Sequence, residues 1–124
     1  MTTPQARKLG LRPGLTVMLD EPPDGWSLDD PPDGLRFMAR GDSPDVVIAF
    51  FKQASDIPDR LLSLAELIRP KGAMWAAWPR RAGGHLSDIT DNIVRSHALE
   101  LGLVDVKVAA IDDDWSGLRL VWRR

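Results

Sequence analysis

The sequence predicts a single three-layer α/β domain whose β-sheet is mostly parallel and ends in an antiparallel C-terminal hairpin. Residues 45–51 and 73–78 are continuously apolar and partly β-branched, the pattern of strands covered on both faces. Each is followed by a segment with apolar residues at helical spacing, 56–68 and 88–101. The chain of 124 residues has the size of one domain, which we place at residues 1–124.

The elements of the first half follow from turn signals. Residues 4–9 can form a short helix, and Pro13-Gly14 marks a turn before a strand at 15–20. The segment 21–34 is rich in Pro, Asp and Gly and is expected to be mostly irregular. Residues 35–38 read as a short strand, although its link to the next strand is shorter than the roughly dozen residues that parallel strands usually need.

The second half alternates strand and helix. A cap at Ser55 or Asp56 begins the first helix, and a cap near Asp88 begins the second. The chain ends in strands at 104–111 and 118–123, and the turn between them is too short for a crossover, so the last strand must be antiparallel. Right-handed crossovers then predict the sheet order 2-1-3-4-6-5, with helices on both faces.

Composition excludes several classes of function. The chain has no cysteine, which rules out disulfides, thiolate zinc sites and cysteine nucleophiles. Its formal net charge of -2 argues against coating nucleic acid. No apolar run approaches the ~20 residues of a membrane helix, and residues 1–10 lack the apolar segment of a signal peptide. We expect a cytoplasmic protein with no nucleic-acid or membrane partner.

Charge is distributed unevenly along the chain. Eight carboxylates lie between Asp20 and Asp45 against two arginines, whereas the four charged residues from Arg69 to Arg81 are all basic. An acidic region and a basic region can support a homodimer. A solvated surface explains the same pattern.

Several segments resemble known families. Residues 65–75, where a helix ends at Pro-Lys-Gly before a strand, and the closing strands around Trp115 resemble the second half of class I methyltransferases, which have a Rossmann-like fold. A closer resemblance, to an uncharacterised bacterial family called domain of unknown function 3052, rests on three motifs: Lys8-Leu-Gly-Leu-Arg-Pro-Gly14, Asp88-Ile-Thr-Asp91 and Asp114-Trp-Ser-Gly-Leu-Arg119. That resemblance covers nearly the whole chain and implies no activity.

The likeness to methyltransferases implies S-adenosylmethionine, but the sequence departs from the family where this cofactor sits. In the family it lies on a glycine-rich turn after the first strand, which lets the backbone approach the ligand closely. Here the turn reads Asp20-Glu-Pro-Pro-Asp-Gly25, and its two prolines have no N–H to donate. Ala39 and Arg40 follow the second strand, where the family has a ribose-binding acid. We therefore expect a truncated methyltransferase-like scaffold that uses no cofactor.

Ligands of open α/β sheets bind beyond the carboxyl ends of the strands, where the loop of residues 79–88 is expected to lie. Guanidinium forks and flexible backbone amides before a helix favour phosphate or carboxylate. The candidate anion-binding residues are Arg80, Arg81, Gly83 and Gly84. An ordinary exposed loop explains the same residues, and an Asp88 cap would compete with an anion for the amides at the helix start.

Other side chains are expected at the same edge. The candidates to line a groove there are Trp26, Trp78, Trp115, His85 and Asp88. Anchoring of loops to the core is an equally good interpretation of the tryptophans. His85 can act as an acid or base near neutral pH, but spacing identifies no partner for it. The histidines and acids show no metal-ligand spacing, and residues 112–114 read as a hairpin turn, so we expect no metal.

The leading hypothesis is a non-catalytic binding or regulatory module. One alternative is a small enzyme, or a nucleotide- or anion-binding protein, that uses residues 79–88. Another is a subunit that acts through a protein partner. No nucleophile, base and orienting group can be assembled from spacing. The expected ligand is therefore an unspecified small anion or a protein.

Overall fold

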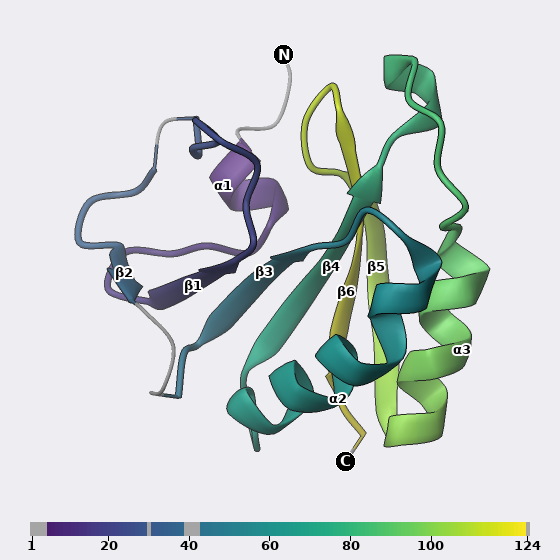
Figure 1. The fold of residues 1–124 in the computed structure, drawn as a ribbon. Helices are drawn as coiled ribbons and strands as arrows, with labels where there is room; N and C mark the ends of the chain where they lie inside the picture. Colours follow the sequence, from purple (N-terminus) through teal and green to yellow (C-terminus); the bar gives the residue numbers. More distant parts are fainter. Residues whose placement is uncertain (1–4, 30, 39–42, 124) are drawn as a thin grey trace.

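A computed structural model of the chain describes residues 5–29, 31–38 and 43–123. It has a six-stranded sheet in the order β2-β1-β3-β4-β6-β5, which confirms the predicted topology (Figure 1). The strands are β1 (Thr16–Asp20), β2 (Arg36–Met38), β3 (Val46–Phe50), β4 (Ala73–Pro79), β5 (Leu103–Ala110) and β6 (Trp115–Trp122). Of these strands, β6 alone runs opposite to the other five, as expected for a strand reached through a tight turn.

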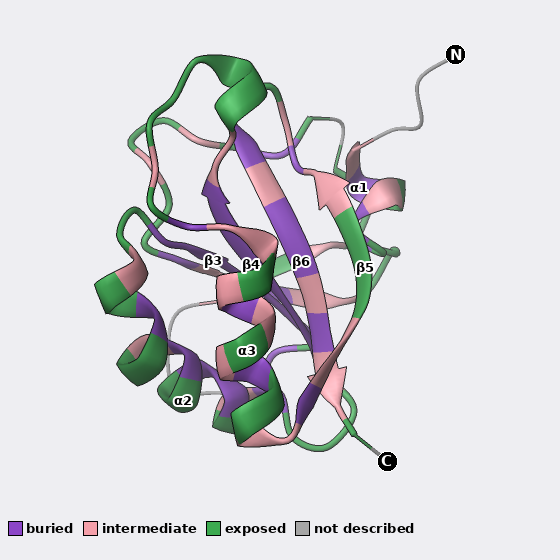
Figure 2. Cartoon of the chain, turned by 90° about the vertical axis from the view of Figure 1, so that its right-hand side faces the viewer, coloured by how far each residue is buried: buried purple, intermediate pink, exposed green. Residues whose placement is uncertain are grey.

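The two faces of the sheet are covered very differently. The described helices are α1 (Gln5–Lys8), α2 (Ile57–Leu67) and α3 (Asp91–Leu101). Both long helices, α2 and α3, pack on one face, and the four-residue α1 lies on the other (Figure 2). Residues 21–29 and 31–35 complete the second face without a helix. We call the two sides the helix face and the loop face.

The sequence led us to expect helices on both faces, and helices lie on both, but the loop face has only the four-residue α1. This uneven cover has a topological cause. The crossovers that contain α2 and α3 both move in the same direction along the sheet, from β3 to β4 and from β4 to β5. Two right-handed crossovers that advance in one direction place their helices on the same face. A long crossover helix for the loop face would have to come from the segment after β1, where prolines and glycines prevent it.

The short link between β2 and β3 is accommodated by the strand register. Met38 pairs with Met18 and Val46 pairs with Val17, so the end of β2 and the start of β3 are one register position apart. The chain has only to cross β1, a distance of about 10 Å at two strand spacings. Seven residues reach about 23 Å when extended. Residues 39–42 of this link lie outside the described part of the chain.

Two boundaries differ from the predicted ones by more than one residue. The second long helix begins at Asp91 with Thr90 as its cap, because the Thr90 side chain accepts a hydrogen bond from the Ile93 amide. The last strand begins at Trp115 and not at 118, because its first residues pair with the end of β4, opposite Pro79. In the described residues, no helix is long and apolar enough to cross a membrane.

Candidate functional site

The loops after β3 and β4 border an open hollow at the carboxyl edge of the parallel strands. It has a volume of about 940 Å³, and we call it the edge hollow. The side that follows β3 contributes Lys52 and Gln53. The longer loop after β4 contributes Arg81, Gly84, His85, Leu86, Ser87 and Asp88. The structure therefore brings four of the nine candidate residues, Arg81, Gly84, His85 and Asp88, into one place.

The glycines of this loop hold its shape. Residues Arg81–Gly83 form a 3-10 turn, and Gly84 follows in the left-handed region at φ 87°. The Gly83 amide donates to the Arg80 carbonyl at 3.1 Å, and the Gly84 amide donates to the Arg81 carbonyl at 2.9 Å. Both N–H groups that the sequence suggested for an anion are therefore used inside the loop. These two amides are therefore not available to a ligand.

Gly83 also permits a close contact with the hairpin between β5 and β6. A Cβ atom at this position would collide with the backbone carbonyl of Asp113. Next to it, the Arg80 amide donates to the Asp114 carbonyl at 2.8 Å. The loop after β4 is thus anchored to the hairpin by its backbone.

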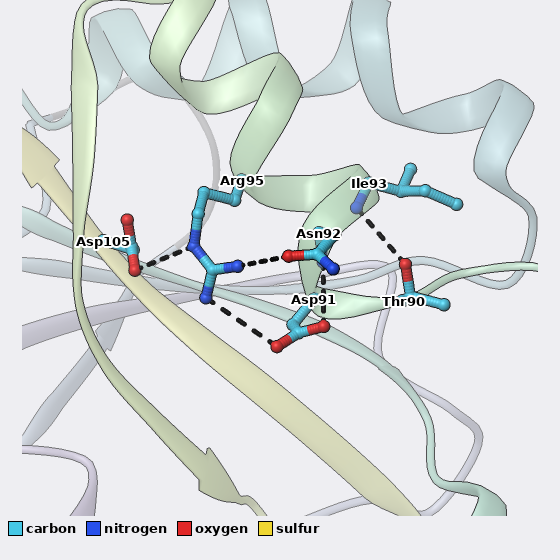
Figure 3. Close-up of polar contacts among 6 residues, drawn as sticks. All are labelled: Thr90, Asp91, Asn92, Ile93, Arg95 and Asp105. Atoms are coloured by element: carbon cyan, nitrogen blue, oxygen red, sulfur yellow. Dashed lines mark hydrogen bonds and ion pairs between the residues drawn. The ribbon is translucent and has the colours of Figure 1, made fainter.

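The amino end of α3 is satisfied by its own side chains (Figure 3). Thr90 Oγ1 accepts from the Ile93 amide at 3.3 Å, and Asp91 Oδ1 accepts from the Asn92 amide at 2.9 Å. The Asp91 carboxylate also places a negative charge in the first turn, which suits the helix dipole. The start of this helix therefore contributes little to an anion site.

Arg95 fastens the first turns of α3 to β5. Its Nε donates to Asp105 Oδ2 at 3.0 Å, and its Nη1 donates to Asn92 Oδ1 at 2.6 Å (Figure 3). The hydrogen bond to Asp105, helped by the charges of Asp105 and Asp91, raises the pKa of Arg95 above its ordinary value. Arg95 therefore stabilises the fold and is not a candidate to bind an anion.

Asp88 lines the edge hollow but caps a different helical segment from the one expected. Its Oδ1 accepts from the Ala54 amide at 2.9 Å, at the start of the short turn that leads into α2. The expected competition between Asp88 and a ligand at the start of α3 therefore does not occur. Asp88 instead joins the loops that follow β3 and β4 across the hollow.

His85 has a partner that the sequence did not reveal. Its Nε2 lies 2.9 Å from Asp114 Oδ1, and both side chains are substantially exposed. The pair also borders a smaller hollow of about 280 Å³, together with Lys52, Leu86 and Trp115. A carboxylate that orients an imidazole is the arrangement of a general base. Asp114 is 29 residues further along the chain, so only the fold brings the two together.

The three candidate tryptophans do not share one groove. Trp78 pairs with Ser116, whereas Trp115 pairs with Pro79, so the two rings point to opposite faces of the sheet. Trp78 packs in the core of the helix face, and borders a hollow of about 470 Å³ with Arg80 and Arg81.

Trp26 and Trp115 belong to an aromatic group on the loop face. Both pack edge-on against Phe50, with ring centroids 4.9 Å and 5.0 Å away. Trp26 Nε1 also donates to Asp112 Oδ2 at 2.9 Å. These contacts are those of loop anchors, one of the two interpretations that the sequence left open.

The acidic triplet after β5 forms the expected hairpin turn. Asp112 Oδ1 accepts from the amides of Asp114 and Trp115, both at 2.8 Å, which closes the turn through its side chain. In the parts of the chain that the structure describes, no group of three or more His, Asp or Glu residues is arranged to hold a metal ion.

The turn after β1 is occupied by an ion pair between β1 and α2. Asp20 is 4% exposed and pairs with the guanidinium of Arg60. Arg60 also lies 3.3 Å from Glu21, and it donates to the Phe50 carbonyl at 2.8 Å. Arg60 was not among the predicted site residues, because an arginine in a helix gives no sign of the strand end it will face.

These residues do not fit the cofactor turn of the methyltransferases. A glycine-rich turn presents amides to the ligand, but this one has prolines and a buried carboxylate held by a cation. Glu21 itself is in the left-handed region at φ 51°. Ala39 and Arg40, at the position of the family's ribose-binding acid, lie outside the described residues.

Solved structures of other proteins share this fold. A protein of the NADB-Rossmann superfamily from Streptococcus agalactiae aligns over 100% of this chain and 71% of its own, with a TM-score of 0.57 and 8% identity. A proposed methyltransferase from Thermoplasma acidophilum aligns over 99% of this chain and 76% of its own, with a TM-score of 0.56 and 10% identity. LepI, solved with SAH and a substrate analogue, aligns over 95% of this chain and 39% of its own, with a TM-score of 0.52 and 14% identity.

Neither a family model nor a curated protein sequence matches the chain. Similarity at 8% to 14% identity establishes the fold alone. The chain has a methyltransferase-like Rossmann fold.

Proposed function

We propose that the chain is a non-catalytic binding module that holds a small anion in the edge hollow, on a methyltransferase-like scaffold without the family's cofactor turn. The observation that carries this proposal is the meeting of Lys52 and Arg81 at one hollow. They follow β3 and β4, which are adjacent parallel strands, and ligands of such sheets bind beyond the carboxyl ends.

The charges of the edge hollow favour an anion. Lys52 and Arg81 each bring a positive charge to its lining, and the His85 ring lies in the same lining. Asp88 is the acidic residue among those lining the hollow, and one of its oxygens already accepts from the Ala54 amide. The donors are exposed side chains, so we expect modest affinity that falls as salt is added.

The test is a calorimetric titration with a panel of small phosphorylated and carboxylated metabolites at low salt. Replacing Lys52 and Arg81 together with alanine should weaken the best ligand by about tenfold or more, as expected for the loss of charge-assisted hydrogen bonds. The fold should keep its stability, because exposed substitutions usually change it by less than about 0.5 kcal/mol. Arg36→Ala, at an exposed arginine on the edge strand β2, is the matched control. Equal binding by the double variant contradicts the proposal.

The His85–Asp114 pair favours one second candidate, a small enzyme that uses His85 as a general base. Asp114 would orient the ring, and Lys52 would hold a negatively charged group of the substrate. If so, wild type should turn over a member of the same panel, and His85→Asn should lose that turnover while retaining affinity. If wild type binds a member of the panel but turns none over, the result supports the binding module and contradicts the enzyme.

We also infer membership in domain of unknown function 3052 from the three motifs that resemble it. Two of them lie at features of the sites above: Asp88 to Asp91 borders the edge hollow and leads into α3, and Asp114 to Arg119 opens β6. A family model built from a broad set of its members should match this chain across most of its length.

A further inference from the structure

The loop face contains a second hollow, of about 930 Å³, that no motif suggested. It lies between α1, the segment after it, the edge strand β5 and its neighbour β6, away from the edge hollow. Five cations line it: Arg7, Lys8, Arg12, Lys107 and Arg119. No described residue lining it is acidic, although the whole chain has a net charge of -2. We call it the basic hollow.

Arg119 occupies an unusual position for an arginine. It lies on β6, an inner strand of the sheet, and its register partners are Trp75 on one side and Lys107 on the other. Since directly paired residues share a face, Arg119 lies on the loop face with the fully buried Trp75. Its Nε is buried and has no hydrogen-bond partner. A buried donor without a partner is costly unless something else accepts from it.

The pairing of Lys107 with Arg119 adds a second cost. Like charges that lie directly opposite across two strands are destabilising. Lys107 Nζ finds an acceptor in the Lys8 carbonyl, at 2.9 Å, at the end of α1. Arg119 finds none at its Nε, and none of the five cations forms an ion pair with a described residue. An anion bound among these cations would offset the repulsion between Lys107 and Arg119.

We propose that the basic hollow binds a phosphorylated organic molecule of nucleotide size. Its phosphates would lie among the five cations, with Arg119 as the central donor, and its less polar part would rest on Leu11 and Val106, which also line the hollow. The volume lies within the roughly 300–1,000 Å³ that small-molecule sites span. The site is independent of the edge hollow, because the two share no lining residue.

The competing explanation of Arg119 is structural: its aliphatic stem covers Trp75, and its charge binds no ligand. Arg119→Met separates the two explanations, because methionine keeps a long unbranched apolar side chain and removes the charge. Both explanations predict that the ligand-free variant melts at the wild-type temperature or above, since the apolar stem is kept and the repulsion from Lys107 is gone. Only a binding arginine also predicts the loss of binding.

The experiment is a titration of the whole chain with ATP, and separately with inorganic tripolyphosphate, in metal-free buffer at low salt. We expect Arg119→Met to raise the Kd for both probes about tenfold or more. Arg36→Ala, at an exposed arginine of β2 that lines neither hollow, should leave this binding event unchanged. Loss of binding in Arg81→Ala with no effect of Arg119→Met would support the edge hollow and overturn this proposal.

Lys107→Gln and Arg12→Gln repeat the test at exposed positions if Arg119→Met does not fold. Each should weaken ATP binding several-fold at low salt, and added salt should reduce the difference. If wild type binds neither probe, or if these variants bind both as tightly as wild type, the basic hollow is not a ligand site.

Discussion

The two faces of this sheet are built by different means. On the helix face, α2 and α3 present regular apolar stripes, and residues such as Leu61, Leu64 and Val94 interlock with the strands in a continuous core. On the loop face, irregular chain is held by a few large rings with polar groups at their ends. Trp75 Nε1 donates to the Leu9 carbonyl at 2.9 Å, and Trp26 Nε1 donates to Asp112.

The difference shows how a sheet face can be covered without long helices. A helix satisfies its own backbone and needs only apolar side chains below it, whereas a loop must be tied down by specific hydrogen bonds. Cover of the second kind is thin and leaves gaps. The basic hollow lies in such a gap, and it would have no place beneath a layer of packed helices.

The largest expected effect compares core leucines on the two faces. Leu64→Ala, at a fully buried position of α2, should lower the free energy of unfolding by about 3 kcal/mol, because packed helices and strands cannot close the cavity. Leu28→Ala, on the loop face, should cost only about 1–2 kcal/mol because irregular chain relaxes into the space. Urea denaturation measures both. Equal losses would mean that the loop face is as rigid as the helix face.

An added methyl group next to Trp75, on the loop face, should clearly lower the free energy of unfolding. A Cβ at Gly117 would lie 2.7 Å from Ile111 Cδ1 and 2.9 Å from the Trp75 ring, and both neighbours are buried. Gly117→Ala should therefore destabilise the fold by about 2 kcal/mol in the same measurement. If Gly117→Ala unfolds at the same urea concentration as wild type, the anchoring rings move more freely than their hydrogen bonds imply.

Substitutions at Thr90 and Asp88 should show which of these two residues caps α3. Thr90→Ala removes the bond to the Ile93 amide and should cost about 1 kcal/mol. Asp88→Ala should leave α3 capped and act instead through the Ala54 amide, which hydrogen exchange would report as faster exchange at the start of α2. Faster exchange at Ile93 in Asp88→Ala would contradict the assignment of Thr90 as the cap.

A single polar anchor of the loop face should contribute less. Trp26→Phe keeps an aromatic ring against Phe50 and removes the hydrogen bond to Asp112, so we expect a loss of about 0.5–1 kcal/mol. Trp26→Leu, which also removes the ring contact, is the comparison variant and should lose more. If both variants lose the same amount, the hydrogen bond carries the whole effect of the anchor.

The smallest expected effect is that of S-adenosylmethionine. The turn after β1 lies where the family binds this cofactor, and its buried Asp20 is held by Arg60. At millimolar concentration we expect no change in Tm. A ligand with a Kd near 100 μM would add roughly 1.4 kcal/mol at tenfold excess. That corresponds to several degrees in a domain of this size, so a shift of that kind would show that the turn opens to admit the cofactor.

Much of the fold was predictable because strong local signals agreed with one another. Continuous apolar strands, helical spacing after each and a turn too short for a crossover were sufficient for the sheet order. The site was less predictable. The sequence placed Arg81 and His85 on the correct loop, but hydrogen bonds inside that loop had already used the Gly83 and Gly84 amides.

Other site features depended on distant pairs. The partner of His85 comes from the β5–β6 hairpin, and the partner of Asp20 comes from α2. Arg119 had one local sign, its place between Leu118 and Leu120 in an alternating strand, which puts it on the opposite face from both leucines. The sequence does not show whether that face of the sheet is exposed to solvent or buried in the core.

By itself the sequence determined the number and order of the strands, the two long helices and the absence of a glycine-rich turn, because these depend on residues close together in the chain. The tertiary structure decided which face each helix covers and which charges meet. Those outcomes depend on the direction of each crossover and on the register of neighbouring strands. The pairing of Lys107 with Arg119 is the clearest case: twelve positions apart along the chain, they lie opposite each other only once β5 and β6 have aligned.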